Sequence, residues 1–278
     1  MTPDEFLRAY HARHPGATAL AFADGRCADG RSSYQLLADL PRAGERILDL
    51  GCGDGHLLEL LVRRGCRSLV GLDMSPEELA GAAARPALAG VKLALARGQA
   101  LPLAAGSLDW VLSHLAFMLM SDIETVVAEL CRVLRPGGRF AAVVGGGPAL
   151  DGAGEDGFAL YLRLFRDAYD AIAEGERAPR IGDRRTREAG GFAALFHPES
   201  GFDPAIEETE VTIRLDAGAE RVWDILSSMY EMLVVPAAAQ AALRQRFLVE
   251  ARALAGREGL VPCAMRCRLL VATRARAT

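Results

Sequence analysis

The stretch RILDLGCGDGHL, from Arg46 to Leu57, changes character abruptly at its midpoint. Its first half is mostly apolar and indicates a buried strand, and glycine then follows at alternate positions, Gly51, Gly53 and Gly55. Glycine is favoured where the backbone takes a positive φ or approaches a ligand too closely for a Cβ atom. Because apolar residues of helical spacing come next, this order predicts a ligand-binding turn whose following helix offers unpaired N–H groups to polar ligand atoms.

The spacing of these glycines disfavours a dinucleotide site. The dinucleotide fingerprint has glycine at its first, third and sixth positions, and the sixth position here is His56. NAD and FAD are therefore disfavoured as ligands. A purely structural strand-turn-helix connection without a ligand is the remaining alternative.

A second strand is predicted at Ser68 to Leu72, and it ends in Asp73 and Met74. A carboxylate about 20 residues beyond the glycine turn is placed to accept hydrogen bonds from both hydroxyls of a ribose. Met74 is suited either to pack on a flat base or to fill the core. The sequence therefore predicts a nucleoside-containing ligand beside Asp73.

Residues 46–144 resemble in detail the class I S-adenosylmethionine (SAM) dependent methyltransferases, and the rest of the chain is similar to them more loosely. Four segments carry the resemblance. They are Asp49 with the glycines of the first turn, Asp73, the passage RGQALPLAAGSLD at 97–109 and the turn LRPGG at 134–138. The resemblance implies SAM as cofactor and an α/β fold. That fold is a Rossmann-like, seven-stranded, mostly parallel sheet with an antiparallel strand 7, helices on both faces and a partly helical lid.

The resemblance also implies which residues contact the cofactor. These are Tyr34, Asp49, Gly51, Cys52, Gly53, Gly55, Asp73, Met74, Gly98, Gln99, Ser113 and His114. One position departs from the family pattern, because the aspartate that usually meets the adenine amino group is replaced by Arg97. Arginine has only donors and cannot accept from that group. Gln99 and the backbone at Gly98 are the two alternatives for the missing acceptor.

His114 follows the fourth predicted strand, Asp109 to Ser113. In the resembled fold the switch in strand order lies between the first and fourth strands, so Ser113 and His114 are expected to face the reacting methyl group. A histidine pKa near about 6.5 suits proton removal at neutral pH, which makes His114 the candidate catalytic base. The alternative is a polar residue that only lines the pocket.

Residues 1–45 are expected to form a helical lid, with helices near 4–11 and 32–40, the second capped by Ser32 or Ser33. In the resembled family this region often folds over cofactor and substrate. The candidate substrate contacts are Tyr10, His11, His14, Arg31 and, on a helix expected at 158–173, Tyr169. The alternative is a pair of helices whose polar side chains only face solvent.

Residues 46–278 are predicted to form the methyltransferase domain, with a helical substrate-cap insertion at about 150–200. Arginines at 177–187 are either a site for an anionic substrate group or a solvated surface. Further expected elements are a fifth strand at 139–144, a sixth at 211–215 and a last at 263–273, with helices at 186–195, 219–233 and 237–255. A helix starting after Asp122 is expected to be capped by that residue and to bury one face.

Composition narrows the class of protein. The net charge of −4 argues against a nucleic-acid substrate. Six cysteines without a C-x-x-C pair argue against a disulfide framework or a metal site, and favour small buried residues. No secretory leader and no membrane-length apolar run is recognisable, so a cytoplasmic protein is expected, either monomer or homodimer, without membrane partners.

The expected function is methyl transfer from SAM to an oxygen or nitrogen of a small-molecule acceptor by in-line displacement. Methylation of a carrier-bound acyl group or of a ring carbon is a second hypothesis. A SAM-binding protein that no longer transfers the methyl group and serves as a partner is a third.

Overall fold

The computed structural model describes residues 1–149, 155–188 and 190–276. Its centre is a seven-stranded sheet in the order β3-β2-β1-β4-β5-β7-β6. The strands are β1 (Arg46–Leu50), β2 (Ser68–Asp73), β3 (Lys92–Leu95), β4 (Leu108–His114), β5 (Leu134–Pro148), β6 (Glu207–Arg214) and β7 (Ala264–Thr273). Strands β1 to β5 pair in parallel, whereas β7 is antiparallel to both of its neighbours. The predicted fold class is confirmed.

The switch in strand order lies between β1 and β4. Strand β1 pairs with β2 on one side and β4 on the other, and the chain runs outward from β1 in both directions. Ligands of open parallel sheets bind in the crevice beyond the carboxyl ends of strands at such a switch. The glycine turn follows β1 and therefore lies at this crevice.

Alternate strand residues face two separate apolar cores, as expected for a sheet covered on both faces. Helices α3 (Ser33–Ala38), α4 (His56–Arg63) and α5 (Pro76–Ala83) pack with the core that contains Ile47 and Leu112. Helix α6 (Ile123–Val133) packs with the core that contains Leu48 and Val111. The sequence thus places helices on both faces correctly.

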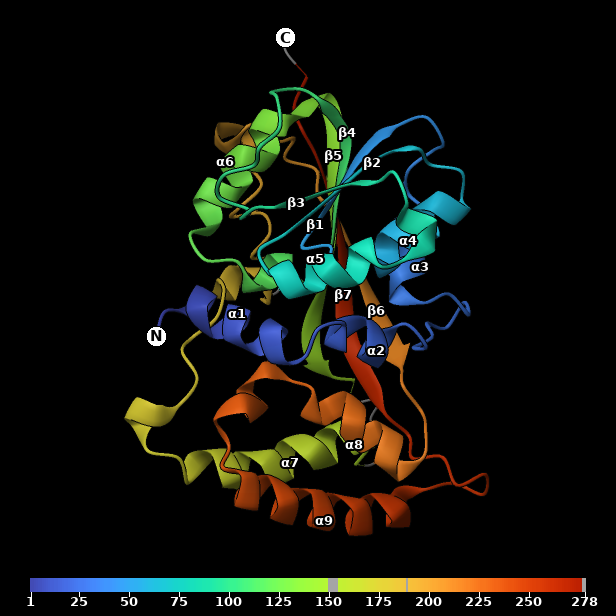
Figure 1. Cartoon of the computed structure of the whole chain (residues 1–278), viewed down its shortest axis with the longest axis vertical. Helices are drawn as coiled ribbons and strands as arrows, with labels where there is room; N and C mark the ends of the chain where they lie inside the picture. The colour runs from blue at the N-terminus through green and yellow to red at the C-terminus, as the bar shows by residue number, and fades with distance from the viewer. Residues whose placement is uncertain (150–154, 189, 277–278) are drawn as a thin grey trace.

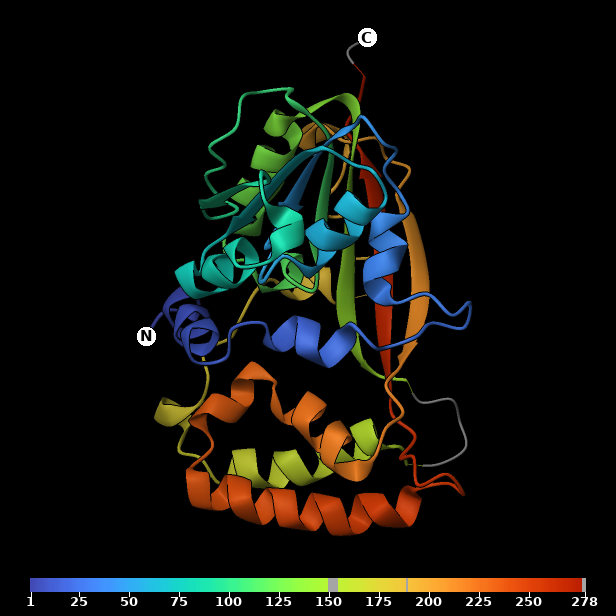
Figure 2. The same ribbon diagram turned by 45° about the vertical axis from the view of Figure 1, so that its right-hand side comes forward.

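A helical layer lies beyond the carboxyl edge of the sheet, with α7 (Gly157–Asp170), α8 (Ala219–Ser227) and α9 (Ala237–Leu254) (Figures 1 and 2). Rings of Tyr161, Trp223 and Phe247 pack against one another in this layer. Helices α1 (Pro3–Arg13) and α2 (Ala17–Phe22) lie between the layer and the sheet. Of residues 1–45, α1 and α2 therefore lie at the carboxyl edge, whereas α3 packs on one face of the sheet. Residues 150–154 of the expected insertion lie outside the described residues.

Several local predictions needed correction. The helix expected at 186–195 is wrong, because the described residues there form the short 3-10 turn Arg184–Thr186 and further turns. A Cβ on Gly191 would lie 2.1 Å from the Arg185 carbonyl oxygen, so the chain is too tightly folded there for a regular helix. Asp122 does precede α6, but it takes a φ of 48° and its side chain makes no capping bond. Helix α2 was not predicted.

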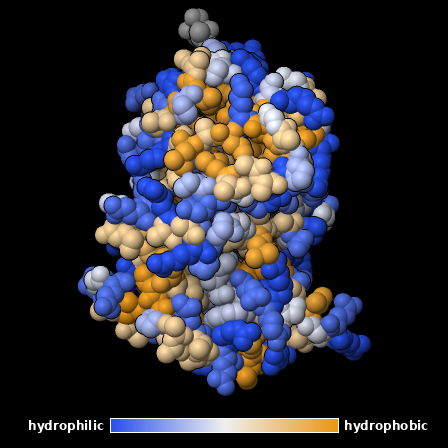
Figure 3. All heavy atoms as spheres, in the orientation of Figure 1, coloured by the Kyte–Doolittle hydropathy of each residue, from blue (hydrophilic) through white to orange (hydrophobic). Residues whose placement is uncertain are grey.

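The exterior is mixed in character. In the face of Figure 3, apolar atoms gather in the upper half, over the sheet and its edge strand β3, and Leu95 in that strand is 61% exposed.

Of the free cysteines, five are buried and Cys131 is half-buried, which fits the expected role of small apolar side chains. Over the part of the chain that the structure describes, no helix is long and apolar enough to span a membrane.

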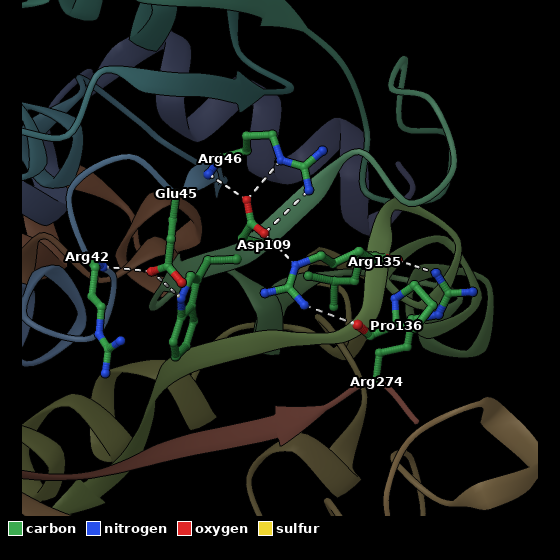
Figure 4. A network of polar contacts seen from close by, with 9 residues as sticks. Arg42, Glu45, Arg46, Asp109, Arg135, Pro136 and Arg274 are labelled. Atoms are coloured by element: carbon green, nitrogen blue, oxygen red, sulfur yellow. Dashed lines mark hydrogen bonds and ion pairs between the residues drawn. The ribbon is translucent and has the colours of Figure 1, made fainter. Parts of the chain in front are cut away.

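Asp109 ties together the amino ends of β1, β4 and β5 (Figure 4). Its carboxylate accepts from the Arg46 backbone N–H at 2.9 Å, from Arg46 Nε at 2.8 Å and from Arg135 Nε at 2.5 Å. These charge-assisted bonds lower the pKa of the Asp109 carboxyl. The neighbouring Trp110 Nε1 donates to Glu45 Oε2 at 3.0 Å and extends the network.

Replacing Asp109 by Ala should lower the free energy of unfolding by about 1–3 kcal/mol, because four donors lose a mostly buried charged acceptor. Urea unfolding at pH 7 measures this change. As a control, Glu155→Ala removes one partner of the exposed Arg163 ion pair and should cost about 0–1 kcal/mol. Equal losses in the two variants would show that the Asp109 network contributes no more than a surface ion pair.

Candidate ligand site at the carboxyl edge of the sheet

Two adjoining hollows lie beyond the carboxyl ends of the parallel strands. The first, here the β1–β4 hollow, is lined by residues after β1 and β4, including Asp49, Gly53 and His114. The second, the β2–β3 hollow, is lined by residues after β2 and β3, including Met74 and Gln99. The residues common to both are His11, Gly51, Asp73, Ala116 and Leu119. The two hollows therefore form one crevice that turns around Gly51 and Asp73.

The glycine turn is left-handed at each of its glycines, with φ of 74° at Gly51, 51° at Gly53 and 83° at Gly55. At Gly51 a side chain is also excluded by contact, since a Cβ would lie 2.4 Å from Ala116 Cβ. The N–H groups of Gly51 and Cys52 donate to the Leu72 carbonyl at 2.8 and 3.0 Å. The turn is thus bent back over the end of β2, which opens the crevice.

Asp73 lies at the corner of the crevice. Its Oδ2 accepts from the Gly53 N–H and its Oδ1 from the Ser75 N–H, both at 2.9 Å. Burial raises the pKa of this carboxyl, and the two backbone donors oppose that shift. Because each carboxylate oxygen can accept a second hydrogen bond, both oxygens can still accept from a ligand.

Asp49 is buried in β1 with an unsatisfied oxygen. The residue is 1% exposed, and its Oδ2 has no hydrogen-bond partner. Burial raises the pKa of the Asp49 carboxyl strongly, and the charges of Asp73 and Asp54 add to the shift. A buried acceptor without a donor is costly. The β1–β4 hollow is therefore prepared for a ligand that carries a positive or hydrogen-donating group.

His114 ends β4 and is 5% exposed. Its Nε2 lies 2.9 Å from Ser33 Oγ, its Nδ1 has no partner, and its ring stacks on Tyr34 with centroids 3.5 Å apart. Burial, with a smaller contribution from His56, lowers the pKa of His114 to about 3. The sequence-based premise of an ordinary histidine pKa is therefore wrong, and the ring is neutral at physiological pH.

The turn between α1 and α2 is fastened over the β1–β4 hollow by Glu78 of α5. This carboxylate is 2% exposed, pairs with His11 Nδ1 at 2.8 Å and accepts from the Gly16 N–H at 2.9 Å. The open volumes of the two hollows are only about 80 and 70 Å³, against about 300–1,000 Å³ for typical ligand pockets. The crevice is therefore narrow in this structure, with the turn between α1 and α2 packed against it.

The site residues predicted from the sequence lie in different parts of the structure. Those that line the crevice are Tyr34, Asp49, Gly51, Cys52, Gly53, Asp73, Met74, Gly98, Gln99, His114 and His11. Gly55 precedes α4 and packs against Leu88 and Ala82. The Ser113 hydroxyl is fully engaged, because it donates to the Leu50 carbonyl and accepts from the Phe117 N–H.

The other substrate candidates lie apart from the crevice. Tyr10 and His14 line a cleft of about 840 Å³ between α1–α2 and α8–α9. Tyr169 lines a separate hollow with Arg180, Arg184 and Arg187. Arg31 is on the surface, where it pairs with Asp29 and Asp39. The fold thus brings Tyr10 and His14 together, with ring centroids 5.2 Å apart, and leaves Tyr169 and Arg31 elsewhere.

Sequence reasoning missed two carboxylates at the crevice. In the sequence, Glu78 has only the pattern of an acid near the start of a helix, and Asp4 only that of the start of the helix expected near 4–11. Both roles are true locally, since Glu78 lies in the first turn of α5 and Asp4 in that of α1. No local pattern distinguishes an acid in a helix's first turn from one that also faces a ligand, so only the packing of α1 on α5 reveals them.

His114 should make stability depend on pH. Its pKa falls from about 6.5 in the unfolded chain to about 3 in the folded one, so the unfolded chain binds the proton first as pH decreases. The contribution of His114 to the free energy of unfolding is therefore full above about pH 6.5. Below that pH it decreases by about 1.4 kcal/mol per pH unit. The His114→Asn variant lacks this dependence.

Urea unfolding of both proteins between pH 7 and pH 4 tests this difference. Other buried groups contribute equally to both curves, and the lost stacking on Tyr34 adds only a constant offset. Parallel curves for the two proteins would contradict the lowered pKa.

Comparison with known proteins agrees with this geometry. Residues 48–142 match the family model described as a methyltransferase domain. A malonyl-[acyl-carrier protein] O-methyltransferase of Methylococcus capsulatus is 38% identical over 132 residues, which are 45% of this chain and 48% of that protein. The chain thus spans about half the length of this curated relative.

Solved structures support the fold over a longer range. The YcgJ protein from Bacillus subtilis has a TM-score of 0.57 and 19% identity, over 88% of this chain and 99% of that one. A phosphoethanolamine N-methyltransferase 2 from Haemonchus contortus, in complex with S-adenosyl-L-methionine, has a TM-score of 0.56 and 17% identity, over 99% and 60%. These likenesses lead to one conclusion: residues 48–142 are a methyltransferase domain, and the chain around them has the fold of these solved proteins.

Proposed function

We propose that this protein transfers a methyl group from SAM to an oxygen or nitrogen atom of a small-molecule acceptor by in-line displacement. The observation that carries the proposal is the pairing of two carboxylates across the glycine turn. Asp73 has free acceptor capacity at the corner of the crevice, and Asp49 has a buried oxygen without a donor. A ligand with a ribose and an ammonium group satisfies both.

The chemical groups of the residues that line the crevice match those of SAM. Asp73 would hold the ribose hydroxyls, and the α-ammonium group would supply the donor that Asp49 Oδ2 lacks. The apolar wall of the β2–β3 hollow, with Leu72 and Met74, suits the flat purine. When bound, SAM supplies a methyl group on a positively charged sulfur. The protein then has to orient the acceptor and to exclude water, which the closed α1–α2 segment does.

The state of His114 restricts the acceptor. A ring whose pKa is lowered to about 3 is a weak base, so it removes a proton from a phenol or alcohol poorly. It can instead orient the acceptor through Nδ1, which has no partner inside the protein. Acceptors that are nucleophilic without such a base, namely carboxylates and neutral amines, are therefore favoured.

Methylation of a carrier-bound acyl group is the second candidate. Two observations favour its carboxylate form. A relative of similar sequence is named a malonyl-[acyl-carrier protein] O-methyltransferase, and a carboxylate needs no base to attack. Calorimetry with SAM and its demethylated product, S-adenosylhomocysteine, followed by product assays with free and carrier-bound carboxylates and with amines, tests both candidates. Tight binding without any product would favour an inactive SAM-binding partner protein instead.

Replacing Asp73 by Ala should weaken binding of S-adenosylhomocysteine by about tenfold to 100-fold, because the ribose hydroxyls lose a charged acceptor. Isothermal titration measures the affinity. Asp167→Ala, which removes an exposed acid of α7, is the control and should bind as the unmodified protein does. Unchanged affinity in a folded Asp73→Ala variant would show that the ribose is held elsewhere.

Replacing His114 by Asn should lower kcat by less than about tenfold, because an orienting hydrogen bond is lost but no general base. A general base is typically worth about 10²–10⁴-fold. The rate of the unmodified enzyme should also show no ionisation of His114 between pH 6 and pH 8. A loss of about 1,000-fold, together with a rate that depends on a group of pKa near 6.5, would restore the role of base.

A further inference from the structure

The β2–β3 hollow has a chemical requirement that strand β3 does not meet. A purine with an exocyclic amine presents N–H donors at its edge, and a buried donor without an acceptor loses affinity. Among the residues after β3 that line the hollow, Arg97 has donors only, and Gln99 is the one side chain with an acceptor oxygen. No carboxylate after β3 is available to accept from an amino-purine, so a charged acceptor for its edge has to come from another element.

Helix α1 brings a carboxylate to this place. Asp4 lines the β2–β3 hollow, and Arg97 forms an ion pair with its Oδ2. Ser121 Oγ donates to Asp4 Oδ1 at 3.0 Å. The side chain of Asp4 is only 19% exposed, whereas that of Arg97 is 57% exposed. The carboxylate is therefore oriented from two sides.

Asp4 keeps free acceptor capacity in this arrangement. An ionised carboxylate has about four lone-pair sites, and Ser121 and Arg97 use two of them. Besides Asp73, Asp4 is the only carboxylate among the residues that line this hollow. Gln99 is the competing side chain, since its Nε2 is turned to the Ser121 carbonyl at 2.5 Å and its Oε1 is the end that can accept.

We propose that Asp4 accepts a hydrogen bond from the exocyclic amine of the bound purine, and that Arg97 positions Asp4 for this role. The proposal rests on the proposed function in one respect, namely that the ligand is SAM. It makes α1 a part of the nucleotide site. The purine pocket is then complete only when α1 is docked, which His11 and Glu78 also stabilise at the other end of the helix.

A pair of ligands tests this role directly. Titration calorimetry compares S-adenosylhomocysteine with its analogue that carries hydrogen in place of the purine amine. The unmodified protein should bind the amine-bearing ligand about tenfold to 100-fold more tightly, as expected for a hydrogen bond to a charged acceptor. In Asp4→Ala the two ligands should bind alike, which is the signature of a lost pairwise contact in a double-mutant cycle.

Two further variants separate a direct contact from a structural effect. Glu5→Ala, on the exposed side of the same helix, breaks the capping box of α1 and should keep the ligand preference. The double variant Asp4→Ala with Arg97→Asp places a carboxylate at the end of β3 and should regain the preference. Loss of the preference in Glu5→Ala as well would mean that Asp4 acts only by docking α1, and would overturn the proposal.

The outcomes distinguish this proposal from the proposed function. No binding of S-adenosylhomocysteine by the unmodified protein would refute both. Tight binding with equal affinity for the two ligands would refute only the role of Asp4. A preference that survives in Asp4→Ala but is lost in Gln99→Ala would assign the acceptor to Gln99.

Hydrogen exchange of residues 3–13 gives a readout independent of affinity. If Asp4 contacts the purine amine, saturating S-adenosylhomocysteine should slow exchange in α1 more than the deaminated analogue does at equal saturation. Equal protection by both ligands would contradict the contact.

Discussion

The crevice exists because Gly51 and Ala116 approach each other too closely for any other residue at position 51. Gly51 follows β1 and Ala116 follows β4, so the contact joins the ends of the two strands between which the strand order switches. The turn can then fold back onto the end of β2 and hold Asp73 through the Gly53 N–H. Larger side chains would push the ends of β1 and β4 apart and remove the corner at which both hollows meet.

Negative charge dominates the inner part of this crevice. Asp49, Asp73 and Glu78 are largely buried within a short distance of the turn, and their mutual repulsion contributes to the raised pKa values of Asp49 and Asp73. Such a concentration of carboxylates is unfavourable in an empty protein. It suits a ligand that carries a sulfonium and an ammonium group, because each positive charge relieves part of the repulsion. The electrostatics of the site therefore favour a positively charged ligand.

Helices α1 and α2 convert this open edge into a closed site. They are held by contacts that come from three different elements, since Glu78 lies on α5, Arg97 follows β3 and Ser121 precedes α6. The helical layer of α7, α8 and α9 lies on the far side of them, across the cleft of about 840 Å³. This arrangement separates the crevice at the carboxyl edge of the sheet from the larger cleft by one layer of helix.

Local sequence determined the parallel sheet, the glycine turn and Asp73, because strand and helix periods, glycine spacing and the acid after β2 are all properties of neighbouring residues. It also determined the family likeness over residues 46–144. Tertiary structure alone decided the pKa of His114, since burial against Tyr34 and Ser33 depends on α3 folding back from a distant part of the chain. It alone decided that Glu78 holds the lid and that Asp4 reaches the β2–β3 hollow. Burial and long-range packing set the energy of a charge, and no pattern of adjacent residues contains that information.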